Sequence, residues 1–117
     1  MQYMLLIHHE AEGLNASELS KMMQEYMAFT QDLAKSGKLK GGDRLESSGK
    51  ATTVRVRNGK TVTTDGPFAE TKEQLGGYYM VEAKDLAEAI AIAARIPGAR
   101  AGSIEVRSIA SVPGRQG

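Results

Sequence analysis

Tyr3-Met4-Leu5-Leu6-Ile7 is apolar at five consecutive positions and lies almost at the start of the chain. A run this short predicts a strand rather than a helix, and the lack of alternation indicates that both faces of the strand are buried. Tyr78-Tyr79-Met80-Val81, which follows Gly76-Gly77, has the same character. The sequence therefore predicts two strands in the interior of one sheet.

Apolar residues recur at helical spacing in two further stretches, residues 15–36 and residues 85–96. Each stretch begins with a capping-box pattern and is followed by a helix stop, Gly37 for the first and Pro97-Gly98 for the second. The capping residues are Asn15 with Glu18 and Asp85 with Glu88. In the first helix, the stripe Met22-Met23-Tyr26-Met27 is predicted to belong to the core.

The remaining strands are more polar. Residues 51–57 alternate with period two, Asn58-Gly59 is a typical two-residue hairpin turn, and residues 61–64 form the return strand. A polar hairpin of this kind is predicted at a sheet edge. A short strand or bend is expected around Leu39, and residues 104–107 alternate as a last strand with one dry face.

This order of elements predicts an α+β protein with the ferredoxin-like split βαβ fold and an extra edge hairpin. Two helices can cover only one face of the sheet. The other face would hold either Met4 and Leu6 or Tyr3, Leu5 and Ile7, and a contiguous apolar patch usually marks an interface. We therefore expect a homodimer in which two copies pair sheet to sheet.

The composition narrows the class of protein. With 117 residues the chain has room for one domain, predicted over residues 1–110 with a frayed tail over 111–117. The absence of cysteine excludes disulfides and thiolate metal sites and suits the cytoplasm. A net charge of +1 with 5% aromatic residues argues against nucleic acid as a partner. No apolar run reaches the length of a signal peptide or a membrane span, so no membrane association is expected.

Asp65-Gly66-Pro67-Phe68 is the first candidate for chemistry. Asp, Gly and Pro are typical turn residues, so the tetrapeptide can be read as a rigid connector. It can also be read as a rigid mount that holds the Asp65 carboxylate as a general base or hydrogen-bond acceptor, with Phe68 as an apolar wall. The sequence leaves both interpretations open.

His8 and His9 end the first predicted strand and point to opposite faces, because side chains alternate along a strand. They cannot bind one metal ion as neighbours, and no metal or cofactor site is predicted. Each is either a solvated residue or a proton-transfer group. A histidine paired with Asp65 is the most useful acid–base couple that the chain offers, and the sequence leaves open whether His8 or His9 approaches it. Asp43-Arg44 can lie at a pocket mouth, with the arginine suited to anions, or in a solvated loop.

The stretch from Thr64 to Tyr79, TDGPFAETKEQLGGYY, resembles the signature of the DGPF proteins within the YCII-related family. The resemblance extends over essentially the whole domain. It implies a dimeric α+β barrel of two ferredoxin-like sheets in a small bacterial cytoplasmic protein, and many such proteins are encoded beside extracytoplasmic-function sigma factors. Other family members are thought to use an Asp and a His on the first helix, and one relative is a dehydrochlorinase of a hydroxylated aromatic. Here residues 15–36 contain no histidine.

From the resemblance, the protein is expected to bind or transform a small polar or aromatic metabolite in a cleft of the dimeric barrel. Asp65 and His8 are the catalytic candidates. The candidates for substrate binding are Gly66, Pro67, Phe68, Lys72, Asp43 and Arg44; Glu73 is a weaker motif position. The alternatives are a non-catalytic ligand-binding or regulatory module associated with a sigma factor, and a purely structural role. Whether the protein is an enzyme stays open.

Overall fold

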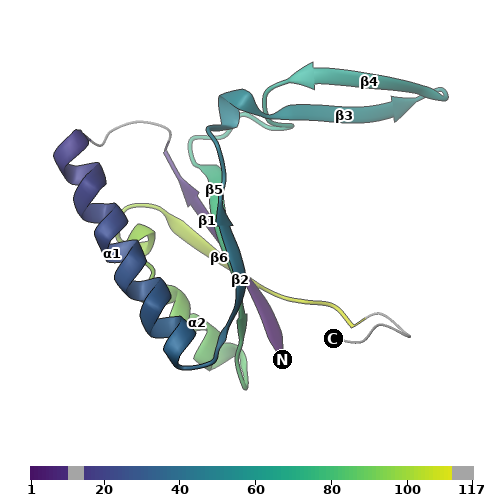
Figure 1. Cartoon of the computed structure of the whole chain (residues 1–117). Coiled ribbons are helices and arrows are strands. Elements are labelled where there is room, and N and C mark those ends of the chain that lie inside the picture. Colours follow the sequence, from purple (N-terminus) through teal and green to yellow (C-terminus); the bar gives the residue numbers. More distant parts are fainter. Residues whose placement is uncertain (11–14, 112–117) are drawn as a thin grey trace.

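A four-stranded antiparallel sheet with two helices on one face forms the body of the protein, for which a computed structural model describes residues 1–10 and 15–111 (Figure 1). The strand order is β2-β5-β1-β6, and the helices are α1 (Ala16–Lys35) and α2 (Leu86–Ala94). The strands of this sheet are β1 (Gln2–His9), β2 (Leu39–Arg44), β5 (Gln74–Glu82) and β6 (Ser103–Ser108). The two strands that the apolar runs predict are thus the central pair, and the ferredoxin-like α+β fold is confirmed.

Both helices begin where the capping patterns predict. The backbone amide of Glu18 donates to Asn15 Oδ1 at 2.8 Å, and Glu18 Oε1 accepts from the Asn15 amide at 3.3 Å. In α2 the amide of Glu88 donates to Asp85 Oδ1 at 2.9 Å. Gly37, with φ of +78°, ends the first helix in the left-handed conformation that glycine adopts without strain. The helix ends can be predicted from the sequence because each capping interaction involves residues only a few positions apart.

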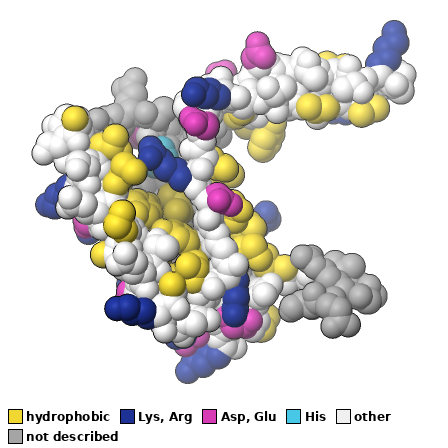
Figure 2. All heavy atoms as spheres, in the orientation of Figure 1, with side chains coloured by type: hydrophobic (Ala, Val, Ile, Leu, Met, Phe, Trp, Pro, Cys, Tyr) yellow, Lys and Arg dark blue, Asp and Glu magenta, His cyan; other side chains and the backbone are white. Residues whose placement is uncertain are grey.

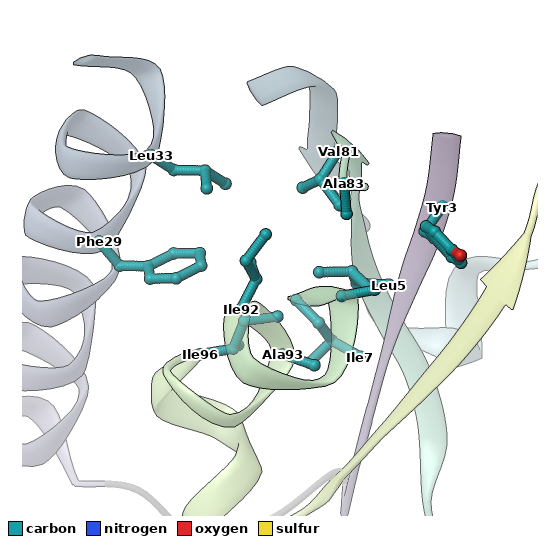
Figure 3. Close-up of a cluster of buried hydrophobic side chains, with 11 residues drawn as sticks. Tyr3, Leu5, Ile7, Phe29, Leu33, Val81, Ala83, Ile92, Ala93 and Ile96 are labelled. Carbon is teal, nitrogen blue, oxygen red and sulfur yellow. The ribbon is translucent and has the colours of Figure 1, made fainter. Parts of the chain in front are cut away.

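The core lies between the helices and the sheet (Figure 3). Alternation along β1 sends Tyr3, Leu5 and Ile7 toward the helices, where all three are buried. The helices contribute Phe29, Leu33, Ala89, Ile92, Ala93 and Ile96, and β5 contributes Val81. The continuous apolar run of β1 is thus divided between two faces, of which one is core.

The prediction that Met22-Met23-Tyr26-Met27 belongs to the core is wrong for Met23 and Met27, whereas Tyr26 packs against the core and Met22 is half-buried. Met23 and Met27 are 48% and 62% exposed, whereas Phe29 and Leu33 are the buried residues of α1. The C-terminal half of the helix therefore packs on the core, and its N-terminal half does not. Part of the methionine stripe lines a cavity instead, as described below.

The predicted hairpin is confirmed, but it forms a sheet of its own. Within the described residues, strands β3 (Thr52–Arg57) and β4 (Lys60–Asp65) pair with each other alone and project past one end of the main sheet (Figure 1). Asn58 and Gly59 have φ of 52° and 74°, as a type I′ turn requires. The edge beside β5 is occupied by β2, which the sequence indicated only as a strand or bend. A 3-10 turn, Ser48–Lys50, joins β2 to the hairpin, and another, Pro97–Arg100, follows α2.

In the described part of the chain, no helix covers the second face of the sheet (Figure 1). The register of the central pair places Met4 opposite Met80 and Leu6 opposite Tyr78, and these four half-buried side chains share this open sheet face. Within the same residues, neither helix is both long and apolar enough to cross a bilayer. The predicted frayed tail lies outside the described residues apart from Ser111.

Candidate functional site

A cavity of about 420 Å³, here called the α1 cavity, lies between the N-terminal half of α1 and the ends of β1, β2 and β5. Figure 2 shows it as a hollow between helix and sheet with hydrophobic side chains around it. Its apolar walls come from Ile7, Leu19, Met22, Met23, Tyr26 and Tyr79. The lining also includes His9, Glu10 and Arg44, with Tyr26 from α1. Asp43 and Tyr78 border the cavity too, but the register places their side chains on the open sheet face. Volumes of this size with mostly apolar walls and few polar groups are typical of small-molecule sites.

Two glycines let polar side chains lie close to the cavity backbone. A Cβ at Gly76 would come within 2.1 Å of His9 Nε2, and a Cβ at Gly98 would come within 2.5 Å of the Tyr26 hydroxyl oxygen. Because a real side chain cannot come so close, any larger residue would displace the histidine or the tyrosine. The sequence places these glycines far from their partners, so the pairing is visible only in the fold.

The hydrogen bond of His9 assigns the position of the proton on its neutral ring. His9 Nδ1 is 2.8 Å from the carbonyl oxygen of Glu10. A carbonyl only accepts, so Nδ1 carries the proton in this bond. In the neutral ring Nε2 is then the acceptor. His9 is an exposed residue that lines the cavity, and its Nε2 lies against Gly76.

Arg44 brings a positive charge to the α1 cavity. Alternation places its side chain on the helix side of β2, where Nη1 donates to Met23 Sδ at 3.8 Å. The acidic lining residues have other partners: Glu10 pairs with Lys72 at 3.3 Å, and Asp43 accepts a hydrogen bond from the Tyr78 hydroxyl at 2.8 Å. Among residues 1–10 and 15–111, no carboxylate forms an ion pair with Arg44.

The pKa values of Tyr26 and Tyr78 are both raised, but the two side chains lie on different faces: Tyr26 lies on the helix side, and the register places Tyr78 and Asp43 on the open sheet face. Burial raises the pKa of Tyr26, whose hydroxyl oxygen accepts a hydrogen bond from the Gly98 amide at 3.1 Å. The hydrogen bond to the Asp43 carboxylate, with its negative charge, raises the pKa of Tyr78. The Tyr78 hydroxyl donates its proton to Asp43, whereas the Tyr26 hydroxyl accepts with its oxygen and keeps a proton to donate.

The structure places the catalytic candidates His8 and Asp65 apart from the α1 cavity and does not join them by a hydrogen bond. His8 points to the open sheet face, where Nε2 lies 3.2 Å from Glu105 Oε1. Asp65 is exposed at the end of β4, opposite Thr52. The prediction that the two histidines lie on opposite faces therefore agrees with the geometry, and the proposed His8 and Asp65 couple stays a prediction.

The other signature residues surround the root of the hairpin. The Thr53 hydroxyl donates to the carbonyl of Gly66, and the Gly66 amide donates to the carbonyl of Ala51, at 2.8 and 2.7 Å. These bonds support the interpretation of the turn as a rigid connector. Pro67 and Phe68 line a second, more open hollow of about 710 Å³ with His8, here called the hairpin cavity, and Phe68 is 81% exposed.

For Asp43 and Arg44 the sequence left a pocket mouth and a solvated loop open; both residues border the α1 cavity, and their role in binding stays a prediction. Sequence reasoning did not identify Tyr26, Met22 or the cavity role of His9. The methionine stripe was the available signal, since flexible apolar side chains line adaptable binding surfaces as well as cores. An apolar stripe that extends along a helix beyond the part that packs on the core indicates a candidate binding surface.

The fold and the cavity define a class: a ferredoxin-like α+β domain with a small-molecule-sized cavity under its first helix. The YCII-related domain model matches residues 1–112, so the chain belongs to the YCII-related family. A relative from Rhizobium meliloti, itself uncharacterised, is 36% identical over 115 residues, which cover 94% of this chain and 93% of that protein.

A solved structure with the same fold is the 5-chloro-2-hydroxyhydroquinone dehydrochlorinase from Burkholderia phenoliruptrix, in complex with 2,5-dihydroxybenzoquinone. The match covers 94% of each chain with a TM-score of 0.50 and 13% sequence identity. At that identity the likeness shows the shared fold.

Proposed function

We propose that this protein binds a small polar or aromatic metabolite in the α1 cavity and acts on it there. The observation that carries the proposal is the half of α1 that does not pack on the core. Its apolar side chains Leu19, Met22 and Met23 line a cavity that also contains Arg44 and His9. Apolar walls bind a ring or chain by the hydrophobic effect, and a few polar groups set its orientation. A protein of the same fold holds a dihydroxybenzoquinone, which makes hydroxylated aromatics the first compounds to test.

Filling the cavity is expected to abolish binding. Met22 is half-buried and lines the cavity, so Met22→Trp should raise the dissociation constant of a bound aromatic at least tenfold. This corresponds to a loss of roughly 1.4 kcal/mol or more of binding free energy. A thermal-shift screen of a library of aromatic acids and 2,5-dihydroxybenzoquinone identifies a compound that binds. Titration calorimetry then measures its dissociation constant for each variant. Met27→Trp is the matched control, because Met27 is 62% exposed on the same helix and outside the cavity. Equal binding by both variants would contradict the proposed site.

The signature turn supports a second candidate site. His8, Pro67 and Phe68 line the hairpin cavity, and Asp65 is next to it in sequence, so Asp65 as an acid or base stays a proposal. Because Asp65 is exposed, Asp65→Asn should change the free energy of unfolding by less than about 1 kcal/mol. If the α1 cavity is the site, the variant keeps its ligand affinity. Loss of binding or turnover with the fold intact would move the site to the signature.

The alternative to an enzyme is a ligand-binding or regulatory module that acts with an extracytoplasmic-function sigma factor. That interpretation rests on the family resemblance and predicts saturable binding in the α1 cavity without product. Incubation of the protein with its ligand, followed by mass spectrometry of the small molecule, separates the two. A new product favours the enzyme, and an unchanged ligand with high affinity favours the module.

We further propose that two copies pair through the open sheet face to give the dimeric α+β barrel. Met4, Leu6 and Met80 form an apolar strip there that the helices leave uncovered. The hairpin extends beyond the same sheet with Val54 and Val56 at 59% and 62% exposure, on one face of the hairpin. Figure 2 shows hydrophobic side chains along one side of the hairpin. A second copy would cover both surfaces, and contiguous exposed apolar area of this kind commonly marks an interface.

A further inference from the structure

We propose that the α1 cavity takes an aromatic anion, with Arg44 pairing its anionic oxygen group and His9 Nε2 accepting a proton from it. This inference rests on the proposed function and adds to it the charge of the ligand and the role of each polar residue. None of the residues that carry it belongs to the Asp65 signature turn.

The anionic end of the ligand follows from the charges of the lining. Glu10 and Asp43 are already engaged, by Lys72 and by the Tyr78 hydroxyl. Arg44 contacts a methionine sulfur and, within the described residues, has no acidic partner. A guanidinium beside apolar walls gains most from a carboxylate or phenolate, with which it forms charge-assisted hydrogen bonds. The aromatic part follows from the walls, where Leu19 is apolar and the thioethers of Met22 and Met23 make favourable contacts with aromatic rings.

The proton acceptor follows from the histidine geometry. Since the Glu10 carbonyl holds the proton on Nδ1, the Nε2 lone pair is the basic group that lies in the cavity. In the step we propose, the bond between an acidic hydrogen of the ligand and its carbon breaks, and the hydrogen moves to Nε2 as a proton. The electron pair of that bond becomes an enolate whose negative charge lies on the neighbouring oxygen. The imidazolium returns the proton to the same or a conjugated carbon, so the step needs no co-reactant.

Tyr26 supplies a neutral donor for the developing charge. Its oxygen accepts from the Gly98 amide, and its own proton has no acceptor among the hydrogen bonds of the described residues. A phenol in apolar surroundings that stays protonated can donate to an enolate oxygen, as oxyanion donors do. In this proposal His9 accepts the proton, Tyr26 stabilises the oxyanion, and Arg44 binds the anionic group of the ligand.

The charge preference is tested with 4-hydroxybenzoate and its neutral isostere 4-hydroxybenzamide, measured by titration calorimetry on the full chain. The wild type is expected to bind the benzoate more tightly. Arg44→Met should weaken the benzoate about tenfold or more and the benzamide less than about threefold, because one charge-assisted bond is lost. Arg57→Met is the matched control, since Arg57 is an exposed arginine on the hairpin. Equal binding of the two compounds by the wild type, or an unchanged preference in Arg44→Met, overturns the inference.

The proton transfer is tested with phenylpyruvate, an aromatic acid with an acidic benzylic hydrogen, by following deuterium uptake from D₂O with NMR. We expect the wild type to exceed buffer and His9→Gln to lose at least about a hundredfold of that rate, the usual size of a general-base contribution. Gln31→Ala, the control at an exposed α1 residue that lines neither cavity, should keep the rate. Exchange that survives in His9→Gln, or no exchange above buffer in the wild type, overturns the assignment of His9.

These outcomes separate the inference from the proposed function. If the wild type binds 2,5-dihydroxybenzoquinone or the benzamide in a manner sensitive to Met22→Trp, yet shows no preference for the anion, the cavity is the site and the inference fails. If Met22→Trp has no effect on any bound compound, the site itself is wrong.

Discussion

Replacement of Leu5 by alanine is expected to lower the free energy of unfolding by about 3–4 kcal/mol. The Leu5 side chain is fully buried at the centre of the core, beside the residues of α2 and β5 in Figure 3. Its loss removes buried apolar area and leaves a cavity that close-packed neighbours fill only in part. Urea unfolding followed by circular dichroism measures the change.

The neighbouring leucine is the matched control. Leu6 has the same chemistry but points to the open sheet face, where it is half-buried. Leu6→Ala should cost the isolated chain less than about 1.5 kcal/mol, and the loss should grow with protein concentration if a second copy covers this face. Equal losses for Leu5→Ala and Leu6→Ala at every concentration would contradict the division of the strand into a core face and an interface face.

The second large effect is expected on assembly. In a sheet-to-sheet dimer both protomers contribute a Leu6 to the interface. Leu6→Lys therefore removes two apolar side chains from the interface and places two like charges there. The dissociation constant should rise by about a hundredfold or more, because each buried leucine contributes roughly 1.5–3 kcal/mol. Sedimentation velocity at micromolar concentration should show a dimer for the wild type and a monomer for the variant. Met27→Lys is the control, since Met27 is exposed on α1. A wild-type monomer contradicts the dimer.

The features of the fold that could be predicted from the sequence are those determined by residues close together in the chain. The apolar run around Leu5 specifies a central strand, and the bonds between Asn15 and Glu18 specify where α1 begins. The turn at Asn58-Gly59 specifies the hairpin by its backbone angles alone. Such features form from a few consecutive side chains, so they can be read without knowing the rest of the chain.

The site could be predicted only in part because it depends on distant residues. Tyr26 meets Gly98, and His9 lies against Gly76, at separations that no local pattern encodes. The methionine stripe of α1 has the spacing of a core face, yet Met23 and Met27 are exposed, and spacing alone does not tell which part of a helix face packs on the sheet. Arg44 was one of two open interpretations in the sequence, a residue at a pocket mouth or a residue in a solvated loop, because its neighbours across the cavity come from distant parts of the chain.

The central claim, that the α1 cavity is the binding site, is tested most directly by the two histidines of the chain. His9 lines the α1 cavity and His8 lines the hairpin cavity, so each reports on one candidate site. Two-dimensional NMR of protein labelled with ¹⁵N-histidine, titrated with 4-hydroxybenzoate, follows both rings at once, with His8→Gln and His9→Gln to assign the signals. The account predicts that the His9 signals shift saturably while the His8 signals stay in place. A saturable shift confined to His8 would contradict it and would place the ligand beside the signature turn.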